Sequence, residues 1–412
     1  MELTADEKAI LAGDKGDILR DALRLQYEIG KFWGAKRFIS VSNVHMMGDI
    51  EVLGDAGKSF IDYVAENKAQ TVCPTSTNAR CVDFGFAEQL GQNLDEVNKE
   101  TKIIQSLRDI GITTVDTCIN YQTVYQPHFG EHIAWGDTGT VIYANSIFGA
   151  RTNFESGPSA LAAALTGRTA EYGFHLDWHR KGTLHVKIEF DPKDFADFGV
   201  IGKIAGEANQ NYFSVPVFTG FENRQISSDE LKHLGASLAS YGSMGMFHIA
   251  GITPEARTFD EAFGDNKPTQ TISITAKDIK NVYDSYDNGG APLNLVVFSA
   301  PQLSIHEIKY LASLFKNRRV KDNTHVFITT SNGVKSHAEQ LKYLQTLKEA
   351  GVLILEGVCF YILQNLPQMR KQNGWHNIVT NSAKLANIIK AHKFNPILKR
   401  TQECVDIATK GI

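Results

Sequence analysis

Residues 293–330, LNLVVFSAPQLSIHEIKYLASLFKNRRVKDNTHVFITT, decide the fold class of this protein. Residues 293–299 form a predominantly apolar run that is typical of a buried strand, and residues 304–316 place apolar side chains at helical spacing. Residues 324–330 form a second apolar run after a polar connection. A strand, a helix and another strand of these lengths predict two parallel strands joined by a crossover helix.

The same alternation continues toward the end of the chain. Residues 335–350 show a helical pattern, residues 351–357 and 376–381 show strand patterns, and residues 382–392 are helical again. Repeated strand–helix units of this kind are typical of a doubly wound sheet. We therefore expect an α/β protein with mostly parallel sheets, whose doubly wound C-terminal lobe covers residues 289–412.

The remaining residues, 1–288, are expected to form an N-terminal α/β region, and the sequence leaves open a division of this region into two lobes near 145–180. A capping box at Thr4 and Glu7 starts the first predicted helix. The patterns in this region predict helices over 4–33 and 94–109, a short buried strand over 111–118 that ends at Cys118, and an alternating strand over 181–190.

The composition is that of an ordinary soluble globular protein, with 42% hydrophobic and 21% charged residues in a chain of 412. The net charge of −4 argues against binding to nucleic acid or to a membrane surface, because either would need a basic face. No apolar stretch approaches the roughly 18 residues of a membrane-spanning helix. The five cysteines are scattered and odd in number, which suits free thiols in a reducing cytoplasm better than a disulfide framework.

Candidate ligand-binding groups follow the predicted strands of the C-terminal lobe, which end in FSAPQ, TTSNGVK, EGVC and TNSAK. Ligands of parallel sheets bind outside the carboxyl ends of the strands. Cys359 and Cys118 each follow a predicted strand, although either residue could instead be a small hydrophobe in the core. The polar candidates at the helix starts are Ser331, Lys335, Asn381, Ser382 and Lys384.

A second candidate site lies before the helix that Pro158 is expected to start. A helix N-terminus beside an arginine is suited to a carboxylate or a phosphate, so this loop favours a small anionic substrate. The alternative is that Arg151 pairs with Glu155 and only braces the loop. The candidate residues here are Arg151, Thr152, Asn153, Ser156 and Ser159.

Other motifs give weaker signals. His128 with His132, and His175 with His179, have the four-residue spacing of zinc ligands on a helix. Proline and glycine near the first pair favour a loop, and neither pair belongs to an HExxH motif. The sequence also lacks the GxGxxG, P-loop and GxSxG patterns, so a nucleotide cofactor or a serine nucleophile has no support.

Two longer stretches of the sequence resemble a known family. FGEHIAW (129–135) and ANSIFGARTNFESGPSALAAALTGRTAEYGFHLD (144–177) are similar to the signature of aconitase X, an outlying branch of the aconitase superfamily. Shorter motifs follow in family order along the whole chain, including GDAGKSF (54–60), PTSTN (74–78) and TCINY (117–121). The resemblance implies a hydro-lyase with aconitase-like three-layer lobes and an iron–sulfur cluster held by cysteines.

The resemblance also implies roles for individual residues. Cys118 and Cys359 match metal ligands, and Arg151, Asn153, Ser159 and Lys335 match catalytic positions. An iron with an open coordination position can act as a Lewis acid on a hydroxyl group while a base removes a proton from the neighbouring carbon. The implied substrate-binding residues are Thr75, Asn78, Asn120, Tyr121, Thr152, Ser156, Ser331, Asn381, Ser382 and Lys384.

Two departures from the family pattern bear on the cofactor and the substrate. Ala300, in Ser-Ala-Pro-Gln, stands where relatives have a third cysteine in Gly-Cys-Pro-His. Three alternatives follow: another residue such as His306, Cys73 or Cys81 completes the cluster, a smaller or different metal centre is used, or the cluster has been lost. Relatives also have Ser-Gly-Lys-Ser where this chain has Ser-Ala-Lys-Leu from residue 382, so the substrate could differ.

The sequence therefore predicts the large subunit of a dehydratase. We expect the small swivelling domain of the family to be a separate small subunit. We favour cis-3-hydroxy-L-proline as the substrate, with mevalonate 5-phosphate as the alternative. A catalytically silent, metabolite-binding relative is the second class of function, because Ala300 cannot bind a metal.

Overall fold

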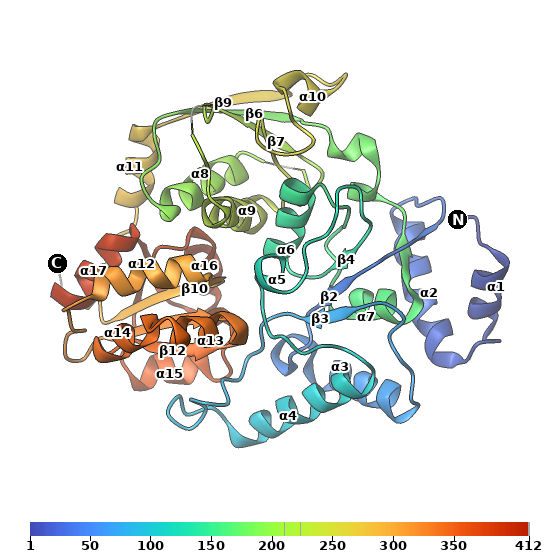
Figure 1. Cartoon of the computed structure of the whole chain (residues 1–412), viewed down its shortest axis with the longest axis horizontal. Coiled ribbons are helices and arrows are strands. Elements are labelled where there is room, and N and C mark those ends of the chain that lie inside the picture. Colours follow the sequence, from blue (N-terminus) through green and yellow to red (C-terminus); the bar gives the residue numbers. More distant parts are fainter. Residues whose placement is uncertain (210, 223, 411–412) are drawn as a thin grey trace.

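The computed structural model describes residues 1–209, 211–222 and 224–410, which form three α/β units around a common centre (Figure 1). Each unit contains its own mostly parallel sheet. In Figure 1 the C-terminal unit is orange and red, the middle unit is green and yellow, and the N-terminal unit is blue to teal. The predicted α/β class with mostly parallel sheets is confirmed.

The C-terminal unit has a five-stranded parallel sheet in the order β12-β11-β10-β13-β14. Side chains of β10 alternate between two cores: Val296 and Phe298 pack on one face of the sheet, and Leu295 and Val297 on the other. Burial on both faces explains the continuous apolar run in the sequence. The strands are β10 (Leu295–Leu303), β11 (His325–Thr330), β12 (Leu353–Glu356), β13 (Asn377–Thr380) and β14 (Asn395–Leu398). The helices are α12 (Ile305–Phe315), α13 (Asn332–Gln340), α14 (Tyr343–Glu349), α15 (Leu366–Gln372), α16 (Ala383–Ile388) and α17 (Thr401–Lys410), with 3₁₀ turns η4 (Phe360–Ile362) and η5 (Ile389–His392).

The strand order places a topological switch point beside β10. From β10 the chain proceeds to β11 and β12 on one side, and then returns to form β13 and β14 on the other. In open α/β sheets a crevice forms at such a point, outside the carboxyl ends of the strands. The ends of β10 and β13 carry Ala300, Gln302, Ser382 and Lys384, so these residues lie where this fold usually binds a ligand.

The middle unit has a four-stranded parallel sheet in the order β8-β7-β6-β9. In β6, buried residues alternate with more exposed ones, as the strand predicted over 181–190 requires. Helices α8 and α9 pack closely, because a Cβ atom on Gly202 would lie only 2.6 Å from the Leu234 carbonyl oxygen. The elements are β6 (Leu184–Glu189), β7 (Pro216–Thr219), β8 (His248–Ile249), β9 (Gln270–Thr275), α8 (Phe195–Glu207), α9 (Ser228–Gly242), α10 (Phe259–Phe263) and α11 (Ala276–Asp284).

The N-terminal unit contains a three-stranded parallel sheet, β3-β2-β4, and an antiparallel pair of β1 with β5. Its strands are β1 (Phe38–Ser40), β2 (Val44–Met46), β3 (Thr75–Thr77), β4 (Ala134–Trp135) and β5 (Arg168–Ala170). Its helices are α1 (Ala5–Ala12), α2 (Asp17–Phe32), α3 (Ile50–Glu66), α4 (Leu94–Asp109), α5 (Asn120–Thr123), α6 (Thr138–Tyr143) and α7 (Gly157–Thr166), with the π-helical η1 (Ala144–Phe148) and 3₁₀ turns η2 (Gly173–His175) and η3 (Asp177–Arg180).

Three predicted elements differ from the structure. The helix predicted over 4–33 is two helices, because Gly13 and Gly16 have φ angles of 93° and 94° and end the helical path. The helix predicted over 335–350 is likewise interrupted at Lys342, where φ is 61°. The segment 111–118 is not a regular strand: it makes one isolated bridge, between Thr113 and Ser76, before the chain turns.

Packing joins the units into one body. One apolar cluster includes side chains from all three units, among them Ile119, Phe198 and Phe298. Figure 1 shows α5 and α6 between the C-terminal unit and the β2–β4 sheet, which is where the candidate site lies. Among the described residues, no helix combines the length and the apolar character that crossing a membrane would require.

Candidate functional site

Cys118 and Cys359 come together from different units of the fold. Cys118 precedes α5, and Cys359 follows β12. The backbone N–H of Gln302, at the end of β10, donates to Cys118 Sγ at 3.2 Å, and the Gln302 side chain donates to the carbonyl oxygen of Val358 at 3.1 Å. The two thiols are also close enough for Cys359 to raise the pKa of Cys118. The structure thus places both predicted metal ligands at the end of β10.

Burial governs the acidity of these thiols. It raises the pKa of Cys118 to about 12, and it also raises the pKa of Cys359, while the nearby ammonium of Lys384 opposes both shifts. Both cysteines are free thiols. A metal that binds them must therefore displace protons, and its affinity will rise with pH.

Lys384 supplies a positive charge at the same point. Its Nζ donates to Thr138 Oγ1 at 3.0 Å and lies 3.8 Å from Asp137 Oδ1. Burial opposes the charged form, but Asp137 and the two thiols outweigh it and raise the pKa of Lys384. The ammonium therefore keeps its proton at neutral pH and can bind an anionic group.

Buried polar atoms without hydrogen-bond partners lie near the thiols. Both Oδ1 and Nδ2 of Asn120 have no partner among the described residues, and the side chain is fully buried. His45 lies nearby, with its Nδ1 2.9 Å from Ser76 Oγ. Burial lowers the pKa of His45 to about 4, so the ring is neutral. Since unpaired buried polar atoms are rare in folded proteins, Asn120 is suited to a bound polar ligand.

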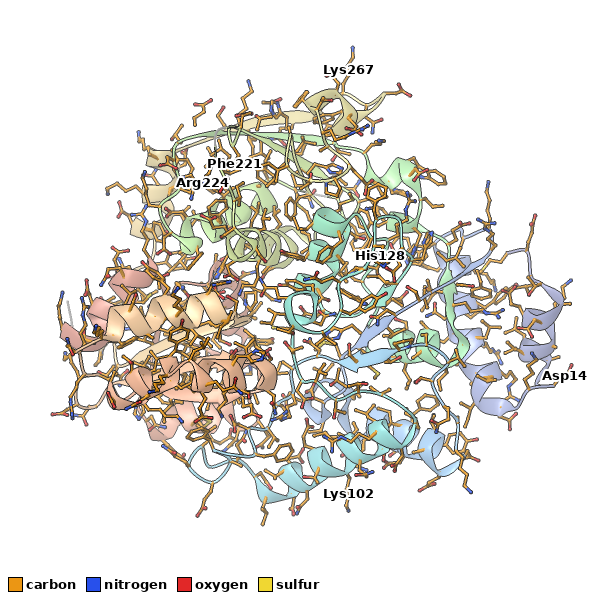
Figure 2. All side chains as sticks on the ribbon, viewed as in Figure 1. Asp14, Lys102, His128, Phe221, Arg224 and Lys267 are labelled. Carbon is orange, nitrogen blue, oxygen red and sulfur yellow. The ribbon has the colours of Figure 1, made fainter. Side chains whose placement is uncertain are left out.

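A cleft of about 800 Å³ is lined by Thr117, the neighbour of Cys118, and by Glu356, but not by Cys118, Cys359, Asn120 or Lys384 themselves. Its walls are formed by α4, residues 114–117, the start of α13 and Glu356. Three cationic side chains line it: Arg80, Lys102 and Arg108. Lys102, labelled in Figure 2, projects from α4. Arg80 is already paired with Asp116, so Lys102 and Arg108 carry the remaining positive charge of the cleft wall.

The loop from Arg151 to Ser159 makes contacts within the fold. Arg151 forms an ion pair with Asp177 and donates to the His175 carbonyl oxygen at 2.8 Å, rather than pairing with Glu155. Asn153 donates to the Tyr172 carbonyl oxygen at 2.9 Å and accepts from the Phe174 N–H. These hydrogen bonds occupy side-chain groups of two predicted catalytic residues.

The helix start after this loop is also occupied. Thr152 accepts a hydrogen bond from the Trp135 N–H, and Ser156 and Ser159 form a capping box at the start of α7. The Glu155 carboxyl group is buried, and Thr169 and Ser159 hydrogen-bond to it. Among the described residues, no hydrogen bond or ion pair joins this loop to Cys118 or Cys359.

The other predicted residues fall into two groups. Ser331 caps α13 and lines the cleft, and Ser382 caps α16 while its hydroxyl donates to the Ala300 carbonyl oxygen at 2.6 Å. Tyr121 stacks on Tyr143, with ring centroids 4.1 Å apart, and its buried hydroxyl lies in the field of Cys118. Three others make contacts within the fold. Lys335 pairs with Glu356, and Asn381 donates to Thr401. Thr75 donates to the Cys73 carbonyl oxygen.

The available donors determine which metal centre fits. Within residues 1–209, 211–222 and 224–410, no three His, Cys, Asp or Glu side chains are grouped to hold a metal ion. Ala300 is buried at the end of β10 and offers only a methyl group. The two thiols and the unpaired amide of Asn120 fit an iron centre bound through two protein thiolates. They do not fit a cluster that needs three protein cysteines.

Three residues of this site were not identified from the sequence. Asp137 follows β4 in the short motif Gly-Asp-Thr-Gly, a helix-start signal like those that pointed to Ser331 and Ser382. His45 lies inside β2, where a single histidine gives no functional signal. Gln302 is an ordinary polar residue in the sequence, and only its contacts across the fold reveal its position.

Comparison with known proteins gives consistent matches along the chain. The models for the first, second and third domains of aconitase X match residues 1–178, 182–284 and 293–410, respectively. The crystal structure of Thermococcus kodakaraensis aconitase X in its holo-form superimposes with a TM-score of 0.88 and 32% sequence identity. That match covers 99% of this chain and 100% of the other.

The curated relatives carry two dehydratase names. The phosphomevalonate dehydratase large subunit of Thermococcus kodakarensis is 34% identical over 96% of each chain. The protein of the same name from Methanocaldococcus jannaschii is 31% identical over 94% of each chain. The cis-3-hydroxy-L-proline dehydratase of Pseudomonas aeruginosa is 30% identical over 93% of this chain and 66% of its own length.

Proposed function

The chain belongs to the aconitase X family, and on that basis we propose that it is the large subunit of a dehydratase that removes water from a small anionic hydroxy acid. The observation that carries the proposal is the meeting of Cys118 and Cys359, beside Lys384, at the switch point of the C-terminal sheet. Residues far apart in the sequence supply two thiols and a cation to one buried point. This arrangement is typical of a functional site rather than of a core.

Cys118 and Cys359 would hold the iron centre that the family implies. When bound, such a centre supplies a Lewis acid that makes a substrate hydroxyl a better leaving group. Because Ala300 provides no ligand, we propose that only these two thiolates come from the large subunit.

Lys384 and Asn120 are proposed to bind the substrate. The Lys384 ammonium stays protonated and is oriented by Thr138 and Asp137, so it can bind a substrate carboxylate or phosphate and stabilise negative charge as it develops. The free amide of Asn120 can donate to one substrate oxygen and accept from another group. Burial of both side chains excludes water from the reacting atoms, which strengthens these interactions.

Mevalonate 5-phosphate is the substrate that we propose to test first. The identity to a phosphomevalonate dehydratase reaches 34%, and the positive charge of Lys102 and Arg108 in the cleft suits a phosphate group. The sequence alone had favoured cis-3-hydroxy-L-proline over mevalonate 5-phosphate, so the order of the two candidates is reversed here. cis-3-Hydroxy-L-proline remains the second candidate, because an enzyme of that name is 30% identical over 93% of the chain.

A separate small subunit is the proposed partner. The name "large subunit" of the phosphomevalonate dehydratases supports this proposal. A second polypeptide could supply the general base and part of the substrate pocket. The free thiols of all five cysteines suit the reducing cytoplasm that we propose as its compartment.

Turnover assays test the proposal. The chain would be prepared without oxygen, supplied with iron and sulfide, combined with its candidate small subunit, and assayed with each substrate. We expect dehydration of one of them, and a loss of about 100-fold or more in kcat/KM for Lys384→Met. Lys390→Met, which removes an exposed lysine from the turn η5 after the same helix, is the matched control and is expected to retain most activity. Failure to dehydrate either substrate in a folded, iron-loaded complex would instead favour a metabolite-binding relative.

A further inference from the structure

Gln302 lies between the two cysteine-bearing loops and uses every polar atom of its side chain on them. It is the penultimate residue of β10 and is fully buried. Its Nε2 donates to the carbonyl oxygen of Asp116 at 3.2 Å and to that of Val358 at 3.1 Å. Its Oε1 accepts from the backbone N–H of Cys118 at 3.3 Å. One amide group therefore reaches both the residues leading into Cys118 and the residue before Cys359.

The backbone of Gln302 adds a contact to the thiol itself, since its N–H donates to Cys118 Sγ at 3.2 Å. Behind it, the Gln302 carbonyl oxygen accepts from Lys232 Nζ at 3.2 Å. Lys232 is fully buried and forms ion pairs with Glu307 and Asp229. These contacts hold the backbone of Gln302, so its amide group has a defined position.

We propose that Gln302 is a positioning residue that sets the separation and orientation of the Cys118 and Cys359 thiols so that both can bind one metal centre. The inference rests on the proposed function in one respect: it takes the metal centre held by these two thiols to be the centre used for dehydration. Cys118 and Cys359 belong to the N-terminal and C-terminal units, and the amide of Gln302 hydrogen-bonds to the loops of both, which fixes the position of one loop relative to the other. Groups that orient metal ligands commonly change metal affinity by about 10-fold to 100-fold when they are replaced.

Cobalt titration of the purified chain tests this inference without any catalytic step. Co²⁺ bound to thiolates gives an intense charge-transfer absorption, which reports the thiolate ligands directly. Gln302→Met keeps the size of the side chain but removes its hydrogen bonds. We expect this variant to bind Co²⁺ about 10-fold to 100-fold more weakly, with a weaker thiolate band, while its circular dichroism spectrum stays that of the wild type.

Gln92→Met is the matched control. Gln92 is also buried and also joins two loops, because its side chain donates to the Cys81 carbonyl oxygen at 3.0 Å and accepts from the Asp83 N–H at 3.1 Å. It also contacts the carbonyl oxygen of Gln364 at 3.5 Å, five residues after Cys359, but its side chain bonds to neither Cys118 nor Cys359 and to no residue next to them. Gln92→Met is therefore expected to lower thermal stability comparably while leaving Co²⁺ affinity within about twofold of the wild type.

A second variant separates the two hydrogen-bonding functions of the amide. Gln302→Glu keeps the acceptor for the Cys118 N–H but places a carboxylate oxygen against the carbonyl groups of Asp116 and Val358. We expect it to weaken Co²⁺ binding at least as much as Gln302→Met, and it decides the question if Gln302→Met does not fold.

The inference is overturned if a folded Gln302 variant binds Co²⁺ like the wild type, if Gln92→Met weakens binding equally, or if the wild type shows no thiolate band. A wild-type protein with the thiolate band but without dehydratase turnover would contradict the proposed function and leave this inference standing.

Discussion

Asn120 shows how a single residue can distinguish a binding site from a core. An unsatisfied buried polar group costs about 1–3 kcal/mol, so a side chain with two unpaired atoms is retained for a reason other than stability. We expect Asn120→Leu to raise the free energy of unfolding, by about 1 kcal/mol, while kcat/KM falls about 10-fold or more. Chemical denaturation and turnover on the same samples provide both measurements.

Asn145→Leu is the matched control for this prediction. Asn145 is equally buried, but its side chain donates to the carbonyl oxygens of Thr152 and Gly245 and accepts from the Thr152 N–H. Its replacement is expected to lower stability, because those backbone groups lose their partner. A loss of stability in Asn120→Leu with unchanged turnover would show that Asn120 is an ordinary core residue.

What the sequence can reveal also differs from residue to residue. Cys118, Cys359 and Lys384 could be proposed because their sequence positions at strand ends and helix starts carry a general rule of parallel sheets. The rule gives the region but not the direction of each side chain, so the sequence could not show that Arg151 and Asn153, predicted as catalytic, bond to Asp177 and Tyr172. These partners are distant along the chain, and no local pattern identifies them.

At the scale of elements, the turn after β12 controls where Cys359 lies. Gly357 has a φ of 67°, and a Cβ atom there would lie 2.5 Å from Arg80 Nη1. Arg80 pairs with Asp116 and donates to the Glu356 carbonyl oxygen at 3.1 Å, so a displaced guanidinium would loosen both cysteine loops. We expect Gly357→Ala to lower the free energy of unfolding by about 2–3 kcal/mol and to reduce bound iron.

Gly374→Ala separates the cost of backbone strain from the cost of the contact between a Cβ atom at position 357 and Arg80. Gly374 has a φ of 60°, but a Cβ atom there would meet nothing within 4 Å. Backbone strain alone should therefore cost about 1 kcal/mol and leave bound iron unchanged. Equal losses of stability and equal iron contents in the two variants would contradict the role assigned to Gly357. Denaturation curves and iron assays decide between the two results.

Helices α3 and α4 enclose a pair of carboxyl groups that should make stability depend on pH. Burial raises the pKa of Asp49 to about 7 and that of Glu100 to about 8, and the Asp49 carboxylate adds to the shift of Glu100. The folded state thus binds more protons than the unfolded state between about pH 4 and pH 8, so stability falls as pH rises through this window. We expect a loss of the order of 6 kcal/mol between pH 5 and pH 8.5.

Glu100→Gln should flatten this pH dependence, because the glutamine side chain does not titrate. The variant should still fold, since glutamine can accept the Ile50 N–H that Glu100 Oε2 accepts at 2.8 Å. Glu96→Gln removes the same charge from a more exposed position on α4 and serves as the control. Urea unfolding at each pH provides the comparison. A slope that is the same in Glu100→Gln as in the wild type would refute the assignment.

At the scale of the whole molecule, a buried ionic cluster joins the middle unit to the C-terminal unit. Lys232 and His233 on α9 both contact the carboxylate of Glu307 on α12. Removing the Glu307 carboxylate leaves Lys232 its ion pair with Asp229 but takes away its contact with Glu307 and the partner of His233, which costs about 1–3 kcal/mol. We therefore expect Glu307→Gln to lower the free energy of unfolding by about that amount, whereas Asp284→Asn, which breaks the exposed pair with Lys280, should change it by less than about 1 kcal/mol.

How much of the whole fold the sequence predicts depends on how far apart along the chain the interacting residues lie. Four strands of the C-terminal sheet could be predicted because each strand–helix unit is local and apolar runs mark strands that are buried on both faces, whereas the short edge strand β14 was not predicted. The N-terminal unit was harder, since its strands are short and its helices break at glycines such as Gly13. Contacts such as Lys232 with Glu307 or Gln302 with Cys118 depend on how the units pack, which periodicity does not report.

Iron bound per chain is the measurement that tests the central claim most directly. It would be made on protein prepared without oxygen, for the wild type, Cys118→Ser, Cys359→Ser and the control Cys73→Ser, a half-buried cysteine outside the site. The account predicts that the wild type and Cys73→Ser hold iron, and that Cys118→Ser and Cys359→Ser each lose it while remaining folded. Iron retained at the wild-type level in either of these two variants would contradict a single metal centre shared by Cys118 and Cys359.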